Sequence, residues 1–155
     1  MESTRPTELV EPVRKSVLVE ASVEHAFHVF TERMAEWWPA RTHSVHEDRA
    51  ETVGLEPRVG GVLYEIGPGG REPWGTITAW EPPHRLAYTW HPGHAVEEAT
   101  EVEVRFTPQG GATLVELEHR GWEARGARAA ERRAGYDTGW ELVLARFAAA
   151  AREPA

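Results

Sequence analysis

The chain has 155 residues, no cysteine and a formal net charge of −8, from 25 acidic and 17 basic residues. This length is typical of one domain with a sizeable core, and the lack of cysteine excludes disulfides, thiolate metal sites and a cysteine nucleophile. The acidic balance disfavours nucleic acid as a partner, and no apolar run approaches the roughly 20 residues of a membrane span. We expect no signal peptide and a cytoplasmic location, because no apolar segment follows a basic start.

The first part of the chain predicts a leader, a strand and a helical pair. Residues 1–12 are polar and punctuated by proline, so we expect a loose leader before a domain over residues 13–151. The β-branched run 13–20 predicts a strand. In residues 21–38, Ser22 suits a helix N-cap and Pro39 ends the helical region. An apolar stripe at helical spacing marks the buried face: Val23, Ala26, Phe27, Phe30 and Met34.

The middle of the chain predicts six further strands. Turns rich in glycine and proline separate residues 49–57, 60–67, 73–81, 85–91, 99–107 and 112–120. In the last two segments apolar and charged residues alternate, with Val102 and Val104 on one face and Glu101 and Glu103 on the other. One solvent-exposed face and one buried face indicate antiparallel hairpins.

The C-terminal segment predicts a long helix that covers the dry face of this sheet. Its apolar stripe also carries Gly139 and is otherwise formed by Tyr136, Trp140, Val143, Leu144, Phe147 and Ala151. A curved antiparallel sheet wrapped on one helix is an α+β arrangement, and it leaves space toward one end for a small-molecule pocket.

The aromatic segment WGTITAWEPPHRLAYTW, residues 74–90, does not alternate cleanly. Strict alternation puts Trp74 and Trp80 on one face with two threonines and leaves Ile77 on the other. A β-bulge between Ile77 and Trp80 would let both point inward. We expect Trp80 to pack beside the turn, whereas Trp74, Tyr88 and Trp90 are candidates for a cavity wall.

Four motifs in order resemble a known family. PRVGGVLYE (57–65), WGTITAWEPPHRLAYTW (74–90), GGATLVELEHRGW (110–122) and YDTGWELVLARFAAAA (136–151) are similar to bacterial single-domain proteins that resemble the activator of the heat-shock protein 90 ATPase. FTERMAEWWPARTHS (30–44) resembles a bacterial subgroup. These proteins belong to the START-like superfamily, also called Bet v 1-like or SRPBCC. The resemblance covers roughly residues 13 to 151.

The resemblance implies a helix-grip fold, in which a curved antiparallel sheet holds the C-terminal helix and two short helices follow the first strand. It also implies a cavity for a hydrophobic or amphipathic small molecule, without a cofactor, and it allows a homodimer. A minority of the superfamily are enzymes, so a cofactor-free cyclase or hydrolase is the alternative function. A weaker alternative, carried by the family name alone, is an interaction protein that assists a chaperone.

Two titratable residues are the candidates for catalysis or for anchoring a ligand. If Leu63 faces the core, Glu65 does so too, because side chains alternate along a strand; otherwise Glu65 is solvated. His119 ends the row Thr113, Val115 and Leu117, and its ordinary pKa suits proton transfer. The other interpretation of His119 is a structural histidine that donates to a backbone carbonyl.

The candidate ligand-binding residues combine these two groups with the aromatic residues. Trp37 and Trp38 are expected near the mouth of the cavity, and Arg132 or Arg133 is either a partner for Glu65 or a surface arginine. The full candidate set is Trp37, Trp38, Glu65, Trp74, Tyr88, Trp90, His119, Tyr136, Gly139 and Trp140.

No metal site or phosphate loop is predicted. Three H-x-x-H pairs occur, at residues 25/28, 43/46 and 91/94, but nothing in the sequence specifies the third ligand that zinc needs. The GPGG segment at 67–70 joins two strands and lacks the lysine of a phosphate-binding loop.

Overall fold

The computed structural model describes residues 11–39, 51–92 and 95–152, and these form an antiparallel sheet and a long helix. The sheet has seven strands in the order β1-β7-β6-β5-β4-β3-β2. The α+β class and the helix-grip arrangement predicted from the sequence are confirmed. The strands are β1 (Val13–Val19), β2 (Thr52–Leu55), β3 (Val62–Gly67), β4 (Gly70–Glu81), β5 (Arg85–Trp90), β6 (Thr100–Gln109) and β7 (Ala112–Arg120).

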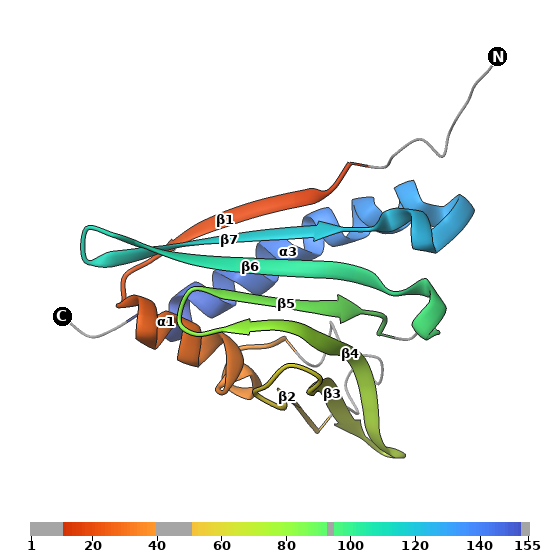
Figure 1. The fold of residues 1–155 in the computed structure, drawn as a ribbon, viewed down its shortest axis with the longest axis horizontal. Coiled ribbons are helices and arrows are strands. Elements are labelled where there is room, and N and C mark those ends of the chain that lie inside the picture. Colours follow the sequence, from red (N-terminus) through yellow and green to blue (C-terminus); the bar gives the residue numbers. More distant parts are fainter. Residues whose placement is uncertain (1–10, 40–50, 93–94, 153–155) are drawn as a thin grey trace.

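The helices lie on one side of this sheet. Figure 1 shows α3 crossing behind the strands, α1 beside the turn between β4 and β5, and β4 bending so that β3 and β2 turn away from the other strands. The described helical elements are α1 (Val23–Thr31), η1 (Met34–Glu36), η3 (Val96–Glu98), η4 (Trp122–Arg128) and α3 (Ala129–Ala151).

Helix α1 begins where the sequence predicts it. The Ser22 hydroxyl accepts a hydrogen bond of 3.2 Å from the backbone N–H of His25, which satisfies one of the free donors at the helix start. The predicted apolar stripe is buried throughout, including Phe27 at 5% exposure and Phe30 at 1%. Helix α1 therefore closes one end of the space between the sheet and α3.

Two register shifts bring the large side chains of β4 to the inner face. One interrupts the pairing of β3 with β4 near Trp74, and the other interrupts the pairing of β4 with β5 between Ile77 and Ala79. Trp74 and Ile77 are consequently both buried, at 0% and 1% exposure. A bulge between Ile77 and Trp80, which the sequence allowed without requiring it, is present, although Trp80 itself is only partly buried.

Strands β4 and β5 approach each other closely beside Trp74. A Cβ atom added to Gly75 would lie 1.8 Å from the backbone oxygen of Thr89, so no side chain fits there without separating the strands. The Thr89 hydroxyl also accepts a hydrogen bond of 2.9 Å from the backbone N–H of Thr76. Gly75 therefore fixes the position of Trp74 against β5.

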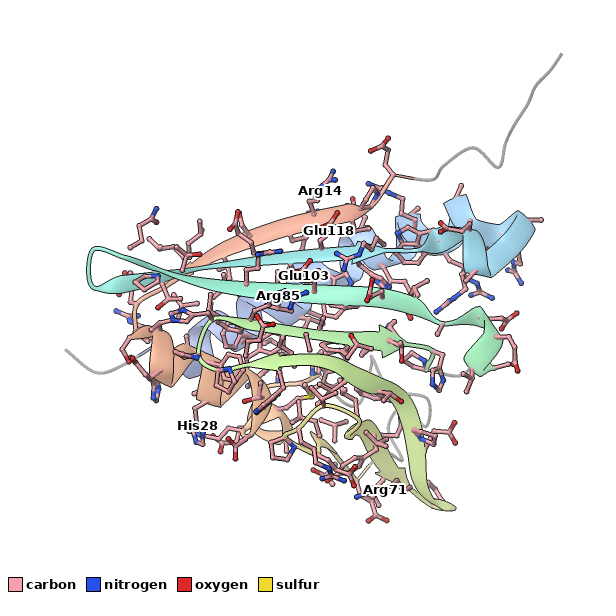
Figure 2. All side chains as sticks on the ribbon, viewed as in Figure 1. Arg14, His28, Arg71, Arg85, Glu103 and Glu118 are labelled. Atoms are coloured by element: carbon pink, nitrogen blue, oxygen red, sulfur yellow. The ribbon has the colours of Figure 1, made fainter. Side chains whose placement is uncertain are left out.

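The outer face of the sheet carries a network of charged side chains. Figure 2 shows Arg85, Glu103, Glu118 and Arg14 following one another across β5, β6, β7 and β1. Glu103 lies among three guanidinium groups, those of Arg85, Arg105 and Arg120, at 2.5 to 2.9 Å. Its side chain is only 8% exposed, because these arginines cover it.

Candidate functional site

Four tryptophan side chains meet between the inner face of the sheet and α3. Trp74 comes from β4, Trp90 from the end of β5 and Trp140 from α3. Trp38 follows η1 and lies among them, with its ring centroid 5.1, 5.9 and 6.1 Å from those of the other three in chain order. Each of the four is at most 6% exposed. We call Trp38, Trp74, Trp90 and Trp140 the aromatic cluster.

The carboxylate of Glu65 reaches this cluster from β3. Leu63 and Glu65 are both 0% exposed, so Glu65 takes the buried one of the two orientations that the sequence left open. The Trp74 indole Nε1 donates a hydrogen bond of 2.7 Å to Oε1 of Glu65. Because a buried carboxylate is costly unless it is hydrogen-bonded, this contact helps to hold Glu65 beside the tryptophans.

His119 touches the cluster from the opposite side, through both ring nitrogens. The Trp140 indole Nε1 donates to Nδ1 at 2.9 Å, and Nε2 lies 2.6 Å from the Thr100 hydroxyl oxygen. The Thr100 hydroxyl in turn donates to the Trp90 carbonyl at 3.2 Å. An indole N–H only donates, so Nδ1 is the acceptor and Nε2 carries the proton. The neutral histidine is thus held in one tautomer.

These contacts limit His119 as a base. Burial, together with the positive charge of Arg125, lowers the pKa of His119 well below its ordinary value. The lone pair on Nδ1 is already engaged by Trp140. In this arrangement His119 holds Trp140 and Thr100 in place, and it accepts an indole N–H rather than donating to a backbone carbonyl as one sequence interpretation expected.

Sequence reasoning did not identify three residues that hold this side of the site. Thr100 bonds His119, and Trp122 lies against the imidazole with ring centroids 4.2 Å apart and donates its indole N–H to the His119 carbonyl. Arg125 is 7% exposed and donates to the carbonyls of Glu98 and Trp90. Nothing in the sequence pattern around Arg125 signals that η4 folds against the end of β5.

Two other aromatic residues of the predicted set, Tyr88 and Trp37, differ in their relation to the cluster. Tyr88 is 1% exposed, with its ring centroid 5.7 Å from that of Trp90. Trp37 packs against Phe30 and Phe147 and donates its indole N–H to the carbonyl of Val29, so it belongs to the packing between α1 and α3. The expectation that Trp37 lies near a cavity mouth finds no support in these contacts.

Of the two interpretations of the arginines in α3, the contacts of Arg133 agree with a surface arginine and not with a partner for Glu65. Its guanidinium donates to the backbone carbonyls of Glu11 and Pro12, at 2.6 and 3.0 Å. Arg133 therefore fastens the chain ahead of β1 to α3. Tyr136 is partly buried, with its ring centroid 5.0 Å from that of His119.

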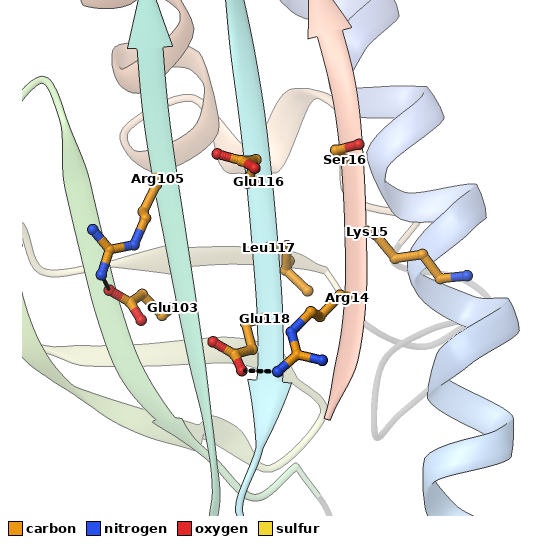
Figure 3. Close-up of a pocket in the computed structure, with 8 residues that line it drawn as sticks. All are labelled: Arg14, Lys15, Ser16, Glu103, Arg105, Glu116, Leu117 and Glu118. Carbon is orange, nitrogen blue, oxygen red and sulfur yellow. Dashed lines mark hydrogen bonds and ion pairs between the residues drawn. The ribbon is translucent and has the colours of Figure 1, made fainter. Parts of the chain in front are cut away.

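Several hollows open outside the cluster among the described residues, and three of them are considered in turn. One of about 310 Å³ lies along α3 and includes Tyr136 and Gly139. A second, of about 510 Å³, lies between α1 and the turn after β4 and includes Trp80. The third, of about 340 Å³, lies on the charged outer face, where Glu103, Glu118 and Arg14 take part in ion pairs (Figure 3). The aromatic cluster lines none of these three.

Within the described ranges, no three histidine or acidic side chains gather as a metal site would require. His25 and His28 lie on α1, whereas residues 43, 46 and 94 of the other two H-x-x-H pairs lie outside the described residues. None of the helices in these ranges is long and apolar enough to cross a membrane.

Solved structures with this fold include two that are also similar in sequence. An anthrahydroquino-γ-pyrone synthase, Txn09, is 39% identical over 91% of this chain and 97% of its own, with a TM-score of 0.61. The self-sacrificing resistance protein CalC from Micromonospora echinospora is 32% identical over 91% and 94%, with a TM-score of 0.68. Protein CV1439 from Chromobacterium violaceum, 16% identical over 94% and 100% with a TM-score of 0.67, supports the fold alone.

The search of curated proteins found no significant match. The family model described as "Activator of Hsp90 ATPase homolog 1-like protein" matches residues 20–152, which is most of the chain. This match confirms the resemblance drawn from the four motifs, including its START-like character. The chain therefore belongs to the family of proteins that resemble homolog 1 of the activator of the Hsp90 ATPase.

Proposed function

We propose that this protein binds a hydrophobic or amphipathic small molecule with a planar ring, and that the ring lies within the aromatic cluster. The observation that carries the proposal is the position of Trp38. Its indole lies against the rings of Trp74, Trp90 and Trp140 at once. The space bounded by these three rings therefore fits a planar bicyclic group, and a ligand that displaces Trp38 would meet the same three walls.

The chemistry of the walls supports a ligand rather than packing alone. A buried indole N–H needs a hydrogen-bond acceptor, so tryptophan fills a core well only where an acceptor is within reach. The cluster is also flanked by two buried polar side chains, Glu65 and His119. Few polar groups among apolar and aromatic walls are typical of small-molecule sites.

The relatives support the same class of ligand. Txn09, at 39% identity, is named as a synthase of an anthrahydroquino-γ-pyrone. That name describes fused planar rings, and a bicyclic part of them matches the space that Trp38 fills. We propose that the ligand of this protein is likewise a polycyclic aromatic or quinonoid compound. Tyr136 and Gly139 would form its approach, since their hollow adjoins Trp140 through Tyr136, with ring centroids 6.5 Å apart.

The test is a thermal-shift titration with three forms of the protein. The ligands are planar polycyclic sulfonates, with fatty acids of similar mass for comparison. Planar compounds should raise the Tm of the wild type and of Trp80→Ala equally, because Trp80 lies outside the cluster. They should raise the Tm of Trp38→Ala by more than that of the wild type, because in this variant the ligand does not have to displace the Trp38 side chain and therefore binds more tightly. The proposal is wrong if no planar compound stabilises either the wild type or Trp38→Ala.

A cofactor-free cyclase is the second candidate, and the identity to a synthase favours it. Glu65 would then transfer a proton of the bound compound, because the lone pair of His119 at Nδ1 is engaged by Trp140. Native mass spectrometry of wild type and Glu65→Gln, purified gently from the source organism, separates the two functions. A binder retains the same mass in both forms. An enzyme would accumulate unconverted substrate in Glu65→Gln, with a mass different from that in the wild type.

A further inference from the structure

The indole N–H of Trp90 is a buried donor without an acceptor among the residues that the structure describes. Trp90 is 3% exposed, and its Nε1 has no hydrogen-bond partner among the described residues. Its ring is central to the cluster, with centroids 5.9 Å from Trp38, 5.4 Å from Trp74 and 5.6 Å from Trp140. Buried polar groups in folded proteins are nearly always paired, so an unpaired one calls for an explanation.

Four other buried indoles donate to acceptors within the protein. Trp74 donates to Glu65 and Trp140 to His119, while Trp37 and Trp122 donate to backbone carbonyls. The fold therefore supplies acceptors both to two members of the cluster, Trp74 and Trp140, and to two tryptophans outside it. Within the described part of the chain it supplies none to Trp90, whose ring borders the place of the proposed ligand.

We infer that the Trp90 N–H recognises an oxygen acceptor on the ligand, so that the protein selects planar aromatic compounds bearing a carbonyl or phenolic oxygen over hydrocarbons of the same shape. This inference rests on the proposed function. The acceptor lies at the Nε1 edge of the Trp90 ring, since an N–H bond points along the ring plane. His119 does not compete for the oxygen, because its own N–H already faces Thr100.

The experiment compares two soluble probes of nearly equal shape, anthraquinone-2-sulfonate and anthracene-2-sulfonate, by isothermal titration. The wild type should bind the quinone about 5- to 10-fold more tightly, the ratio expected for one net hydrogen bond. Trp90→Phe keeps an aromatic ring but lacks the donor, and it should bind the two probes within about twofold of each other. Trp80→Phe, the matched control, should keep the wild-type preference.

The outcomes separate this inference from the proposed function. Equal affinity of the wild type for both probes would overturn the role of Trp90 and leave the proposed function standing. Failure of both the wild type and Trp38→Ala to bind either probe would overturn both. A quinone preference that persists in Trp90→Phe would assign the recognition to another donor and so overturn the inference.

A second measurement tests the free protein without any ligand. Trp90→Phe deletes an unpaired donor, whereas Trp140→Phe leaves Nδ1 of His119 without its donor. Urea unfolding should therefore show a smaller loss of stability for Trp90→Phe than for Trp140→Phe. An equal or larger loss for Trp90→Phe would show that its N–H is already paired in the free protein.

Discussion

The indole Nε1 of Trp74 lies 2.7 Å from Oε1 of Glu65, which joins the bulged part of β4 to the inner face of β3. The contact gives the buried indole of Trp74 an acceptor and the buried carboxylate of Glu65 a donor. It also sets the plane of the Trp74 ring, which forms one wall of the aromatic cluster.

Substitution of Glu65 tests this contact. Glu65→Gln keeps an oxygen acceptor for Trp74, whereas Glu65→Leu has a similar size and none. We expect the free energy of unfolding of Glu65→Leu to be about 1–3 kcal/mol lower than that of Glu65→Gln, because leucine leaves the indole donor of Trp74 unsatisfied. Urea denaturation of both variants measures the difference. Equal stability would mean that the contact contributes nothing net.

The lowered pKa of His119 predicts a pH dependence of stability. The unfolded chain takes up a proton at this residue near its ordinary pKa of about 6.5, whereas the buried imidazole stays neutral. Stabilisation from neutral His119 is therefore complete above about pH 6.5 and is lost as the pH falls from there toward the folded pKa, by up to about 1.4 kcal/mol per pH unit.

The measurement is urea unfolding at several pH values between about 7.5 and 5 for wild type and His119→Gln, which shares all the other titrating groups. The slope of the unfolding free energy against pH should be smaller in His119→Gln than in the wild type. Identical slopes would contradict the neutral, buried state of His119. The ¹⁵N chemical shifts of the imidazole give an independent check, since they identify the protonated nitrogen as Nε2.

The close approach of β4 and β5 predicts that substitution of Gly75 destabilises the protein. Gly75→Ala places a methyl group where the Thr89 carbonyl lies, 1.8 Å from the added Cβ, so the strands must separate. We expect a loss of about 3 kcal/mol or more, comparable with other severe core changes. Gly69→Ala is the control, because its Cβ meets nothing within 4 Å. The Tm of the two variants should differ clearly; a Gly75→Ala protein as stable as Gly69→Ala would refute the steric argument.

The charge network on the outer face predicts an unusual sensitivity at Glu103. Burial alone would raise the pKa of Glu103, but hydrogen bonds from Arg85 and Arg120 and the charge of Arg105 outweigh it, and the pKa is lowered. Its stabilising contribution is therefore complete above the ordinary carboxyl range and is lost as the pH falls through the folded pKa.

Glu103→Gln should lower the unfolding free energy by about 1–3 kcal/mol, since three guanidinium groups lose the anion between them. Glu118→Gln is the control on the same face, with a side chain 31% exposed, and it should cost less than about 1 kcal/mol. Denaturation at neutral pH compares the two variants. A larger loss for Glu118→Gln would contradict the central position of Glu103.

Alternation along strands made the inner face predictable. Alternation placed His119 on the face of Leu117 and Glu65 on the face of Leu63, although the sequence left open whether the Leu63 face is the buried one. The sequence allowed the bulge in β4, because Ile77 and Trp80 could not both face inward without it. Such local rules suffice wherever one element determines which way a side chain points.

Contacts between distant elements were not predictable in the same way. The pairing of Trp74 with Glu65 depends on a bulge that shifts the register of β3 and β4. Glu103 follows the alternation and points outward, yet three arginines from β5, β6 and β7 bury it. The burial of Arg125 and the place of Trp38 among three rings likewise depend on how η4 and η1 pack, which no local pattern encodes.

The central claim is that a planar ligand enters the aromatic cluster, and ¹⁹F NMR of protein labelled with 5-fluorotryptophan tests it most directly. The chain has seven tryptophans, and single Trp→Phe variants assign their resonances. On titration with anthraquinone-2-sulfonate, the account predicts shifts at Trp38, Trp74, Trp90 and Trp140, the largest at Trp38, and none at Trp80. A spectrum that shifts only at Trp80, or does not shift at all, would contradict it.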